Sequence, residues 1–136
     1  MTPGNHEWRG NYSFLSFRLK MPVFKQSNNH YFSFNVGKMH FIGANYIFYD
    51  DEGQEEKERM LAWLRNDLEV ANASRKERPW IIVFSHYPIY CSYNNYSEQS
   101  SKCSSYYGKF KVFDELWYEY RVDLVLGSHV HYWERY

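Results

Sequence analysis

The chain has 136 residues, which is enough for one domain with a hydrophobic core of its own. Its 16 Lys and Arg residues balance its 16 Asp and Glu residues, so it lacks the basic character of proteins that bind nucleic acids or anionic membranes. It contains neither the roughly 18-residue apolar run of a membrane helix nor, at Met1-Thr2-Pro3-Gly4, the basic and apolar regions of a signal peptide.

The first elements predicted along the chain are a loop and a β-hairpin. A Pro-Gly pair is a strong turn signal, so residues 2–8 are expected to form a loop. Residues 31–36 and 39–44 are short runs of strand-forming residues around a Gly-Lys turn, which predicts a β-hairpin. His30 and His40 belong to this hairpin and are expected on its surface.

Two helices are predicted further along the chain. Residues 54–71 are expected to be helical, because acidic side chains crowd the first turns and apolar side chains recur on one face. That face consists of Met60, Leu61, Leu64 and Leu68. Residues 109–120 form a second helical pattern, and the long stretch 90–108 before it lacks periodicity and is expected to be a loop.

A histidine follows each of two apolar runs. The run 80–84 is expected to be a strand covered on both faces, and His86 comes just after it. The run 122–126 is expected to be a short buried strand that precedes His129 and His131. Ligands bind at the carboxyl ends of strands in open α/β sheets, and neutral imidazole is a common ligand of transition metals. Extended residues at i and i+2 share a face, so the last two histidines could aim at one point, and the repeated helix-strand-histidine order predicts an α/β fold.

The cysteines and the glycosylation sequons indicate a compartment. Cys91 and Cys103 both lie in the long loop, where a disulfide would staple it. Asn-x-Ser/Thr sequons occur at Asn11, Asn72 and Asn95. A disulfide together with sequons favours an oxidising, secretory environment, so the expected location is secreted or lysosomal or vacuolar.

Three short motifs occur in a fixed order and carry a family resemblance. They are Gly4-Asn5-His6-Glu7, Val83-Phe84-Ser85-His86 and Ser128-His129-Val130-His131, with His86-Tyr87-Pro88-Ile89-Tyr90-Cys91-Ser92 and Tyr132-Trp133-Glu134-Arg135 around them. With these motifs the chain resembles the purple acid phosphatase branch of the calcineurin-like metallophosphoesterases over essentially its whole length. The resemblance implies one partial domain, residues 1–136, of an α/β fold in which mixed β-sheets flanked by helices form an αββα sandwich.

The resemblance also implies a role for each motif residue. Asn5, His86 and His129 would bind one metal ion, and His131 would bind the other. His6 would contact the phosphate and protonate the leaving group without binding metal. The implied cofactors are two metal ions, Fe together with Zn, Mn or a second Fe. The implied reaction is the hydrolysis of a phosphate monoester, either a small molecule or a phosphoprotein, with no nucleic acid partner and no membrane span.

The sequence departs from the family pattern upstream of its first motif. The family's Asp-x-Gly and Gly-Asp-x-x-Tyr blocks, which supply further metal ligands, have no counterpart here. We therefore expect this chain to be the C-terminal portion of a catalytic domain, from a truncated gene product or a misplaced start at Met1, without its N-terminal half. Asp50 and Asp51 are not expected to replace the missing ligands. We also expect the isolated polypeptide to be unstable or to bind metal poorly.

Two further departures concern single positions. Ser128 stands where the family's last motif has glycine, and a backbone with positive φ would be strained by serine. Asn95 and Tyr96 stand where some plant members hold substrate with histidines. The competing hypotheses are another metallophosphoesterase, such as a phosphodiesterase, and a catalytically inactive fragment that acts as a binding or interaction protein.

Overall fold

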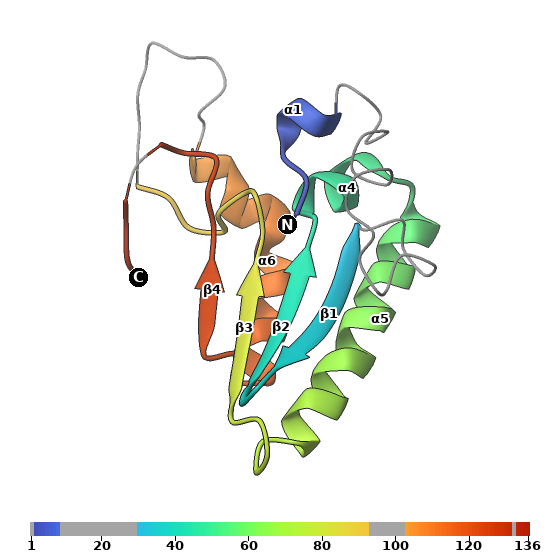
Figure 1. The fold of residues 1–136 in the computed structure, drawn as a ribbon. Helices are drawn as coiled ribbons and strands as arrows, with labels where there is room; N and C mark the ends of the chain where they lie inside the picture. Colours follow the sequence, from blue (N-terminus) through green and yellow to red (C-terminus); the bar gives the residue numbers. More distant parts are fainter. Residues whose placement is uncertain (1, 9–29, 93–102, 132) are drawn as a thin grey trace.

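The computed structural model describes residues 2–8, 30–92, 103–131 and 133–136, and Figure 1 shows their arrangement. In chain order the elements are α1 (Asn5–Trp8), β1 (Tyr31–Val36), β2 (Met39–Ala44), α4 (Tyr46–Asp51), α5 (Gln54–Ala73), β3 (Trp80–Phe84), α6 (Cys103–Glu119) and β4 (Leu124–Leu126). No helix in these ranges is long and apolar enough to cross a membrane.

The strands form one mixed sheet in the order β1-β2-β3-β4. β1 and β2 pair antiparallel as the predicted hairpin, while β3 lies parallel to both β2 and β4. α5 connects β2 to β3 and α6 connects β3 to β4, so the predicted helix-strand repeats are confirmed. The carboxyl ends of β2, β3 and β4 therefore meet at one edge of the sheet, and α1 lies beside that edge (Figure 1).

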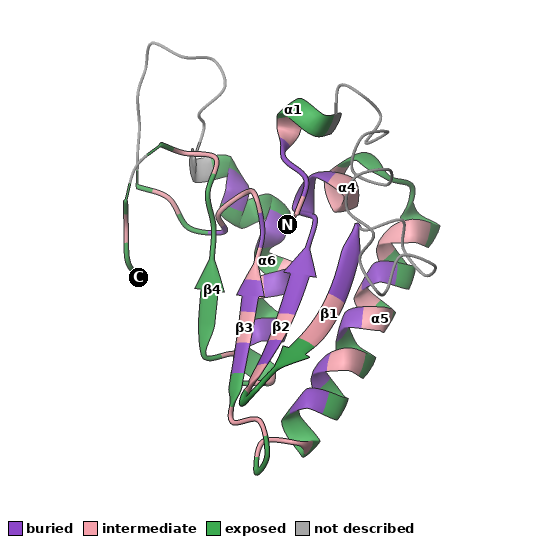
Figure 2. Ribbon diagram, viewed as in Figure 1, coloured by how far each residue is buried: buried purple, intermediate pink, exposed green. Residues whose placement is uncertain are grey.

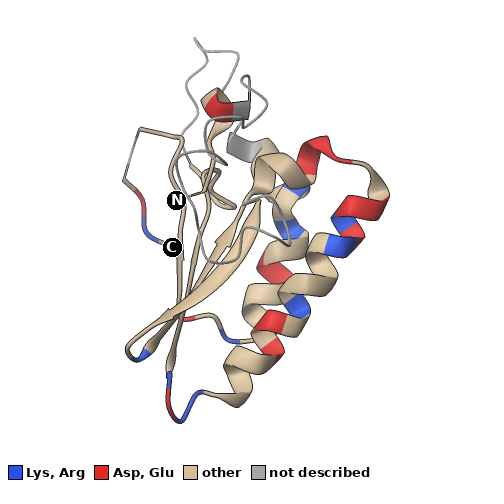
Figure 3. Cartoon of the chain, turned by 45° about the vertical axis from the view of Figure 1, so that its right-hand side comes forward, with Lys and Arg blue, Asp and Glu red and all other residues tan. Residues whose placement is uncertain are grey.

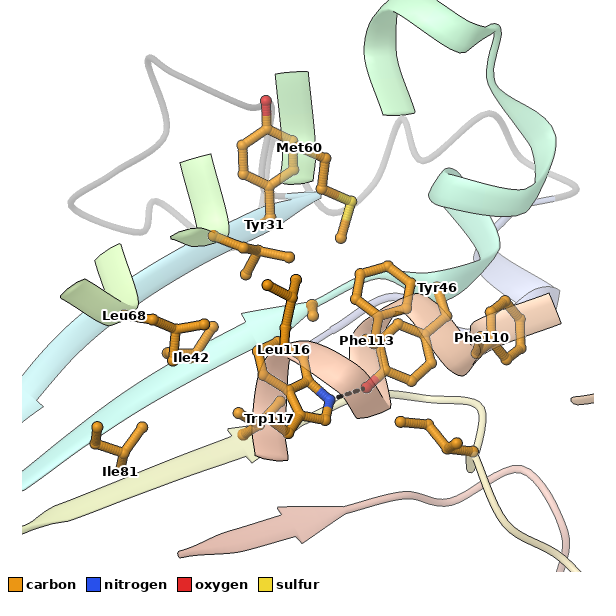
Figure 4. Packing of buried hydrophobic residues seen from close by; sticks show 14 of the residues in the cluster. Tyr31, Ile42, Tyr46, Met60, Leu68, Ile81, Phe110, Phe113, Leu116 and Trp117 are labelled. Carbon is orange, nitrogen blue, oxygen red and sulfur yellow. Dashed lines mark hydrogen bonds between the residues drawn. The ribbon is translucent and has the colours of Figure 1, made fainter. Parts of the chain in front are cut away.

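The hydrophobic core lies between the sheet and its two long helices. α5 and α6 cover the same face of the sheet, as Figures 1 and 3 show from two directions. Close to the centre of Figure 4, Trp117 of α6 donates an indole hydrogen bond of 3.0 Å to the Tyr46 hydroxyl. The fully buried side chains between the sheet and these helices include Ile42, Ile81, Val83, Met60, Leu64, Leu68, Phe110, Phe113 and Leu116. The apolar face predicted for residues 54–71 is thus the face of α5 that packs on the sheet.

The opposite face of the sheet is also apolar, and no described helix covers it (Figure 3). The strand register aligns the side chains of this face across the sheet, and the set is Phe32, Phe34, Phe41, Ile82, Phe84, Trp80, Leu124 and Leu126. Trp80 is 54% exposed, and Leu124 and Leu126 are 47% and 50% exposed. A sheet face made of large apolar side chains is typical of a surface that packs against another layer.

Two predictions about strand burial are wrong for the described residues. β4 was predicted to be a buried strand over residues 122–126, but it spans Leu124–Leu126 and is exposed, as Figure 2 shows in green. The reason is that β4 lies at the edge of the sheet and pairs with β3 on one side. β3 was predicted to be covered on both faces, but the helices bury Ile81 and Val83 while Trp80 faces solvent.

The helices differ from the predictions mainly at their ends. The predicted loop 2–8 contains the short helix α1, and α5 continues two residues beyond its predicted end, to Ala73. α6 begins at Cys103 rather than at residue 109, so part of the predicted loop is helical. α4 was not predicted. Its signal was Asn45, whose side-chain oxygen accepts from the backbone N–H groups of the first turn at 3.1 and 3.2 Å.

His30 and His40 are buried, which corrects the prediction that both lie on the hairpin surface. His40 Nε2 lies 2.9 Å from a carboxylate oxygen of Asp67 in α5, and the Ser33 hydroxyl donates to the same carboxylate at 2.6 Å. Strand alternation alone does not tell which face of the hairpin a helix will cover. In the structure, α5 packs on the face that carries His40. The half-buried Asp67 carboxylate gives that imidazole a hydrogen-bond partner, so the polar group is accommodated in the core.

The pH dependence of stability is expected to reflect His30. Burial lowers the pKa of His30 from its ordinary value of 6.5 to about 4, and its Nδ1 lies 3.3 Å from the side-chain nitrogen of Asn45. Between these pH values the unfolded chain binds a proton that the folded chain does not, so the free energy of unfolding falls as the pH falls through this window. His30→Asn keeps an acceptor for Asn45 but cannot titrate. Urea denaturation at pH 7.5, 5.5 and 4.5 should therefore show a smaller loss of stability in the variant, and equal losses would contradict this assignment.

Candidate metal centre

Three side chains meet at the carboxyl ends of the parallel strands. Asn5 comes from α1, His86 from the segment after β3, and His129 from the segment after β4. In the sequence, Asn5 lies 81 residues before His86, and His129 lies 43 residues after it. The sheet brings the three together because its parallel strands end at the same edge (Figure 1).

The distances between the donor atoms are those of neighbouring ligands on one ion. Asn5 Oδ1 lies 2.9 Å from His86 Nε2, and His86 Nε2 lies 3.2 Å from His129 Nδ1. Two ligands about 2.1 Å from one ion and at right angles to each other are separated by about 3 Å. An amide oxygen with two imidazole nitrogens is a donor set that suits Zn, Fe or Mn. The three residues therefore fit a metal ion in both chemistry and spacing.

The strand ladder holds His86 beyond the end of β3. The Ser85 N–H donates to the Leu126 carbonyl at 2.9 Å, and the Ser128 N–H donates to the His86 carbonyl at 3.0 Å. Gly4 abuts the imidazole ring, since a Cβ at this position would lie 2.9 Å from His86 Cε1. A glycine before Asn5 thus lets the N-terminal segment approach the imidazole closely.

His129 has an unusual backbone. Its φ is +67°, in the left-handed region, and the Val130 N–H donates to the Ser128 carbonyl at 2.8 Å. A side chain other than glycine costs about 1–2 kcal/mol in this conformation. The expectation that Ser128 would carry the strain of the missing glycine is wrong, because the positive φ lies one residue later, on the histidine itself. Strained backbone of this kind is concentrated at functional sites.

The aromatic rings of Tyr87 and Tyr106 form a wall beside His129. The Tyr87 ring meets the imidazole edge-on at 4.5 Å between centroids and stacks on Tyr106 at 5.0 Å. Sequence reasoning named Tyr87 only as context for the second motif and did not identify either tyrosine as part of the site. The available signal was the position of Tyr87 directly after the strand-end histidine.

The two central imidazoles are neutral at neutral pH. Burial, together with the nearby His86, His131 and His6, lowers the pKa of His129 from 6.5 to about 4. Burial also lowers the pKa of His86, against an opposing effect of the Glu7 carboxylate. A neutral imidazole has a free lone pair, which a metal ligand requires.

The other predicted site residues are not part of this trio. His6 and His131 are exposed, and within the described ranges no group of three or more His, Cys, Asp or Glu side chains is arranged to hold a metal ion. His131 is near enough for its charge to affect the pKa of both central histidines. Asp50 forms an ion pair with Lys109 of α6, and the expectation that it does not serve as a ligand stays a prediction.

Several predicted residues stay untested. Asn11, Asn95 and Tyr96 lie outside the described residues, as does the side chain of Cys103, so the disulfide with Cys91 remains a prediction. Asn72 is exposed in the last turn of α5, where its side-chain oxygen accepts from Arg75 at 2.8 Å. Glycosylation at this position is sterically accessible and remains a prediction.

The fold and the site together define an α/β domain that gathers one amide and two imidazole side chains, a donor set suited to a metal ion, at the carboxyl ends of its parallel strands. A family model described as calcineurin-like phosphoesterase matches residues 1–133, and the chain belongs to this family. The resemblance found in the three motifs is therefore confirmed.

The relatives of the chain include named acid phosphatases. Acid phosphatase type 7 of Danio rerio is 36% identical over 98% of this chain and 32% of its own length. The Homo sapiens protein of the same name is 35% identical over 98% of this chain and 31% of its own length. Purple acid phosphatase 23 of Arabidopsis thaliana is 34% identical over 97% of this chain and 28% of its own length. The chain thus spans about a third of the length of these relatives.

Two solved structures share the fold. Purple acid phosphatase PPD1 from seeds of yellow lupin (Lupinus luteus) matches 95% of this chain and 21% of its own, with a TM-score of 0.62 and 22% identity. GAP50, described as the anchor in the inner membrane complex of Plasmodium, matches 94% of this chain and 42% of its own, with a TM-score of 0.59 and 24% identity. These likenesses confirm the predicted fold class.

Proposed function

We propose that this chain forms part of a dinuclear metal centre that hydrolyses phosphate monoesters, as an acid phosphatase of the purple acid phosphatase type. The observation that carries the proposal is the trio of Asn5 Oδ1, His86 Nε2 and His129 Nδ1, with separations of 2.9 and 3.2 Å. The acid phosphatases among its relatives support the same reaction class.

In this proposal the trio holds one metal ion and His131 binds the other. When bound, the two ions, Fe with Zn, Mn or a second Fe, supply Lewis acidity and activate a water molecule for attack on phosphorus. Asn5 contributes an oxygen without negative charge, so it does not weaken that Lewis acidity. The neutral state of His86 and His129, which follows from their lowered pKa values, leaves their lone pairs available for coordination.

His6 is proposed to act on the substrate. It follows the ligand Asn5 directly and is exposed to solvent on α1, so its imidazole is free to meet a phosphate ester at the metal ions. An imidazolium can donate a hydrogen bond to a phosphoryl oxygen and a proton to the leaving alkoxide. The side chains at Asn95 and Tyr96 are proposed to contribute to substrate contacts.

We also propose how the apolar sheet face is used. In an αββα sandwich the second sheet packs on the face opposite the helices, and here that face carries Trp80, Leu124 and Leu126, each about half exposed. Further polypeptide of the kind present in the longer relatives would cover it. Secretion or a lysosomal or vacuolar location, glycosylation and the Cys91–Cys103 disulfide belong to the same proposal.

The alternative hypothesis is a binding protein without catalysis. It is favoured by one observation, that the described residues hold no group of three His, Cys, Asp or Glu side chains arranged around a metal site. A phosphodiesterase is the alternative within the same reaction class.

Metal loading and substrate choice test the proposed function. The full-length protein is loaded with Fe and Zn, or with Fe and Mn, and its metal content is measured after removal of free ions. We expect stoichiometric metal in the wild type, and faster hydrolysis of p-nitrophenyl phosphate than of bis(p-nitrophenyl) phosphate at acid pH. The reverse substrate preference would favour the phosphodiesterase. Absence of stoichiometric metal would reject the enzyme and leave the binding protein.

A further inference from the structure

The hydroxyl of Ser128 lies against two atoms of the same histidine. Ser128 Oγ is 3.2 Å from His86 Nδ1 and 3.3 Å from the His86 carbonyl oxygen. The backbone N–H of Ser128 donates to that carbonyl at 3.0 Å, which holds the hydroxyl in this position. In the family motif that the chain resembles, glycine stands at this place, and glycine has no hydroxyl to make these contacts.

The two contacts together favour one arrangement of hydrogens. A carbonyl oxygen only accepts, so the serine hydroxyl donates its single hydrogen to the His86 carbonyl. The serine oxygen then accepts from the other neighbour, which places the imidazole proton on His86 Nδ1. The opposite ring nitrogen, Nε2, is left with a free lone pair.

The opposite side of the ring creates a competing arrangement. His86 Nε2 lies 2.9 Å from Asn5 Oδ1, and in the metal-free protein this acceptor would favour a proton on Nε2. That tautomer has no lone pair on the nitrogen that faces Asn5 and His129. The tautomer of His86 is therefore decided by the balance between Ser128 on one side and Asn5 on the other.

We propose that Ser128 is a positioning residue, which holds the proton of His86 on Nδ1 and so keeps Nε2 ready to bind a metal ion. Metal-binding histidines generally donate their second N–H to a neighbouring acceptor, which fixes the tautomer and the ring orientation. Ser128 supplies this acceptor from the side chain that replaces the family glycine. The inference rests on the proposed metal centre and deepens it, but it concerns the metal-free protein as well.

The test is the tautomer of His86, read by ¹⁵N NMR of the metal-free protein with labelled histidine at pH 7.5. We expect a predominant Nδ1–H tautomer in the wild type and a shift toward Nε2–H in Ser128→Ala. Ser128→Thr retains a hydroxyl and is expected to behave like the wild type. Ser128 is exposed, so all three proteins should fold, and matching circular dichroism spectra would verify it. An unchanged tautomer in Ser128→Ala would overturn the proposal.

Metal affinity provides a second readout, with Zn²⁺ alone as the probe. Ser128→Ala is expected to bind Zn²⁺ about 10-fold more weakly than the wild type, the lower end of the range for losing such a partner, and Ser128→Thr should restore the affinity. Equal affinities in wild type and Ser128→Ala would reject the role of Ser128. If the tautomer and affinity respond as expected but no phosphate ester is hydrolysed, the proposed function fails while this inference stands.

Discussion

In the full-length protein, replacement of His129 is expected to remove the metal ion that the trio is proposed to hold. Phosphatase turnover should fall by at least about 100-fold, since that ion would provide Lewis acidity and the nucleophile. The sharpest variant is His129→Gly. It deletes the imidazole whose Nδ1 faces His86 at 3.2 Å, and it also suits the backbone φ of +67°. Glycine adopts this conformation without steric cost, so the metal-free variant should be at least as stable as the wild type.

The measurements for this variant separate metal binding from folding. Metal content and p-nitrophenyl phosphate hydrolysis report on the site, and thermal unfolding of the metal-free protein reports on the fold. Tyr118→Ala is the matched control, because Tyr118 is 89% exposed on α6 and has no part in the proposed site. Near-normal hydrolysis by His129→Gly would refute the assignment of this residue as a ligand.

Gly127→Ala is expected to disturb the site through the backbone. A Cβ at position 127 would lie 2.9 Å from Pro88 Cα and 3.1 Å from Pro88 Cβ, which is closer than carbon atoms pack. The segment that carries His86 would have to move away from the segment that carries Ser128 and His129. Overpacking of this kind costs about 1–3 kcal/mol of stability, and the displaced ligand should weaken Zn²⁺ binding as well.

Gly108→Ala is the matched control for this glycine substitution. Gly108 lies within α6, and a Cβ there would meet no atom within 4 Å. Alanine in a helix interior is favoured over glycine by about 0.5–1 kcal/mol, so this variant should unfold at a higher denaturant concentration and bind Zn²⁺ normally. If Gly127→Ala matched the wild type in both stability and Zn²⁺ affinity, the close packing of the two segments would not control the site.

Local sequence patterns predicted most of the architecture. The hairpin β1-β2, strand β3 and the body of α5 lie where the patterns of their residues predicted them, because strand and helix periodicity is a property of neighbouring residues. The prediction was weaker where a neighbour in space decides the outcome. His40 is buried because Asp67 of α5 gives its ring a partner, and this contact spans 27 residues. β4 is exposed because the sheet ends there.

The sequence by itself determined the family and nominated Asn5, His86 and His129, because the motifs consist of adjacent residues in a fixed order. Only the tertiary structure decided that Asn5 Oδ1 and His129 Nδ1, although 81 and 43 residues away from His86 in the sequence, both lie within 3.2 Å of His86 Nε2. The structure also showed that the positive φ belongs to His129 and not, as predicted, to Ser128. The Ser128 hydroxyl instead contacts the His86 ring. These features depend on where parallel strands end and how the segments beyond them pack, and such contacts between distant residues leave no local pattern in the sequence.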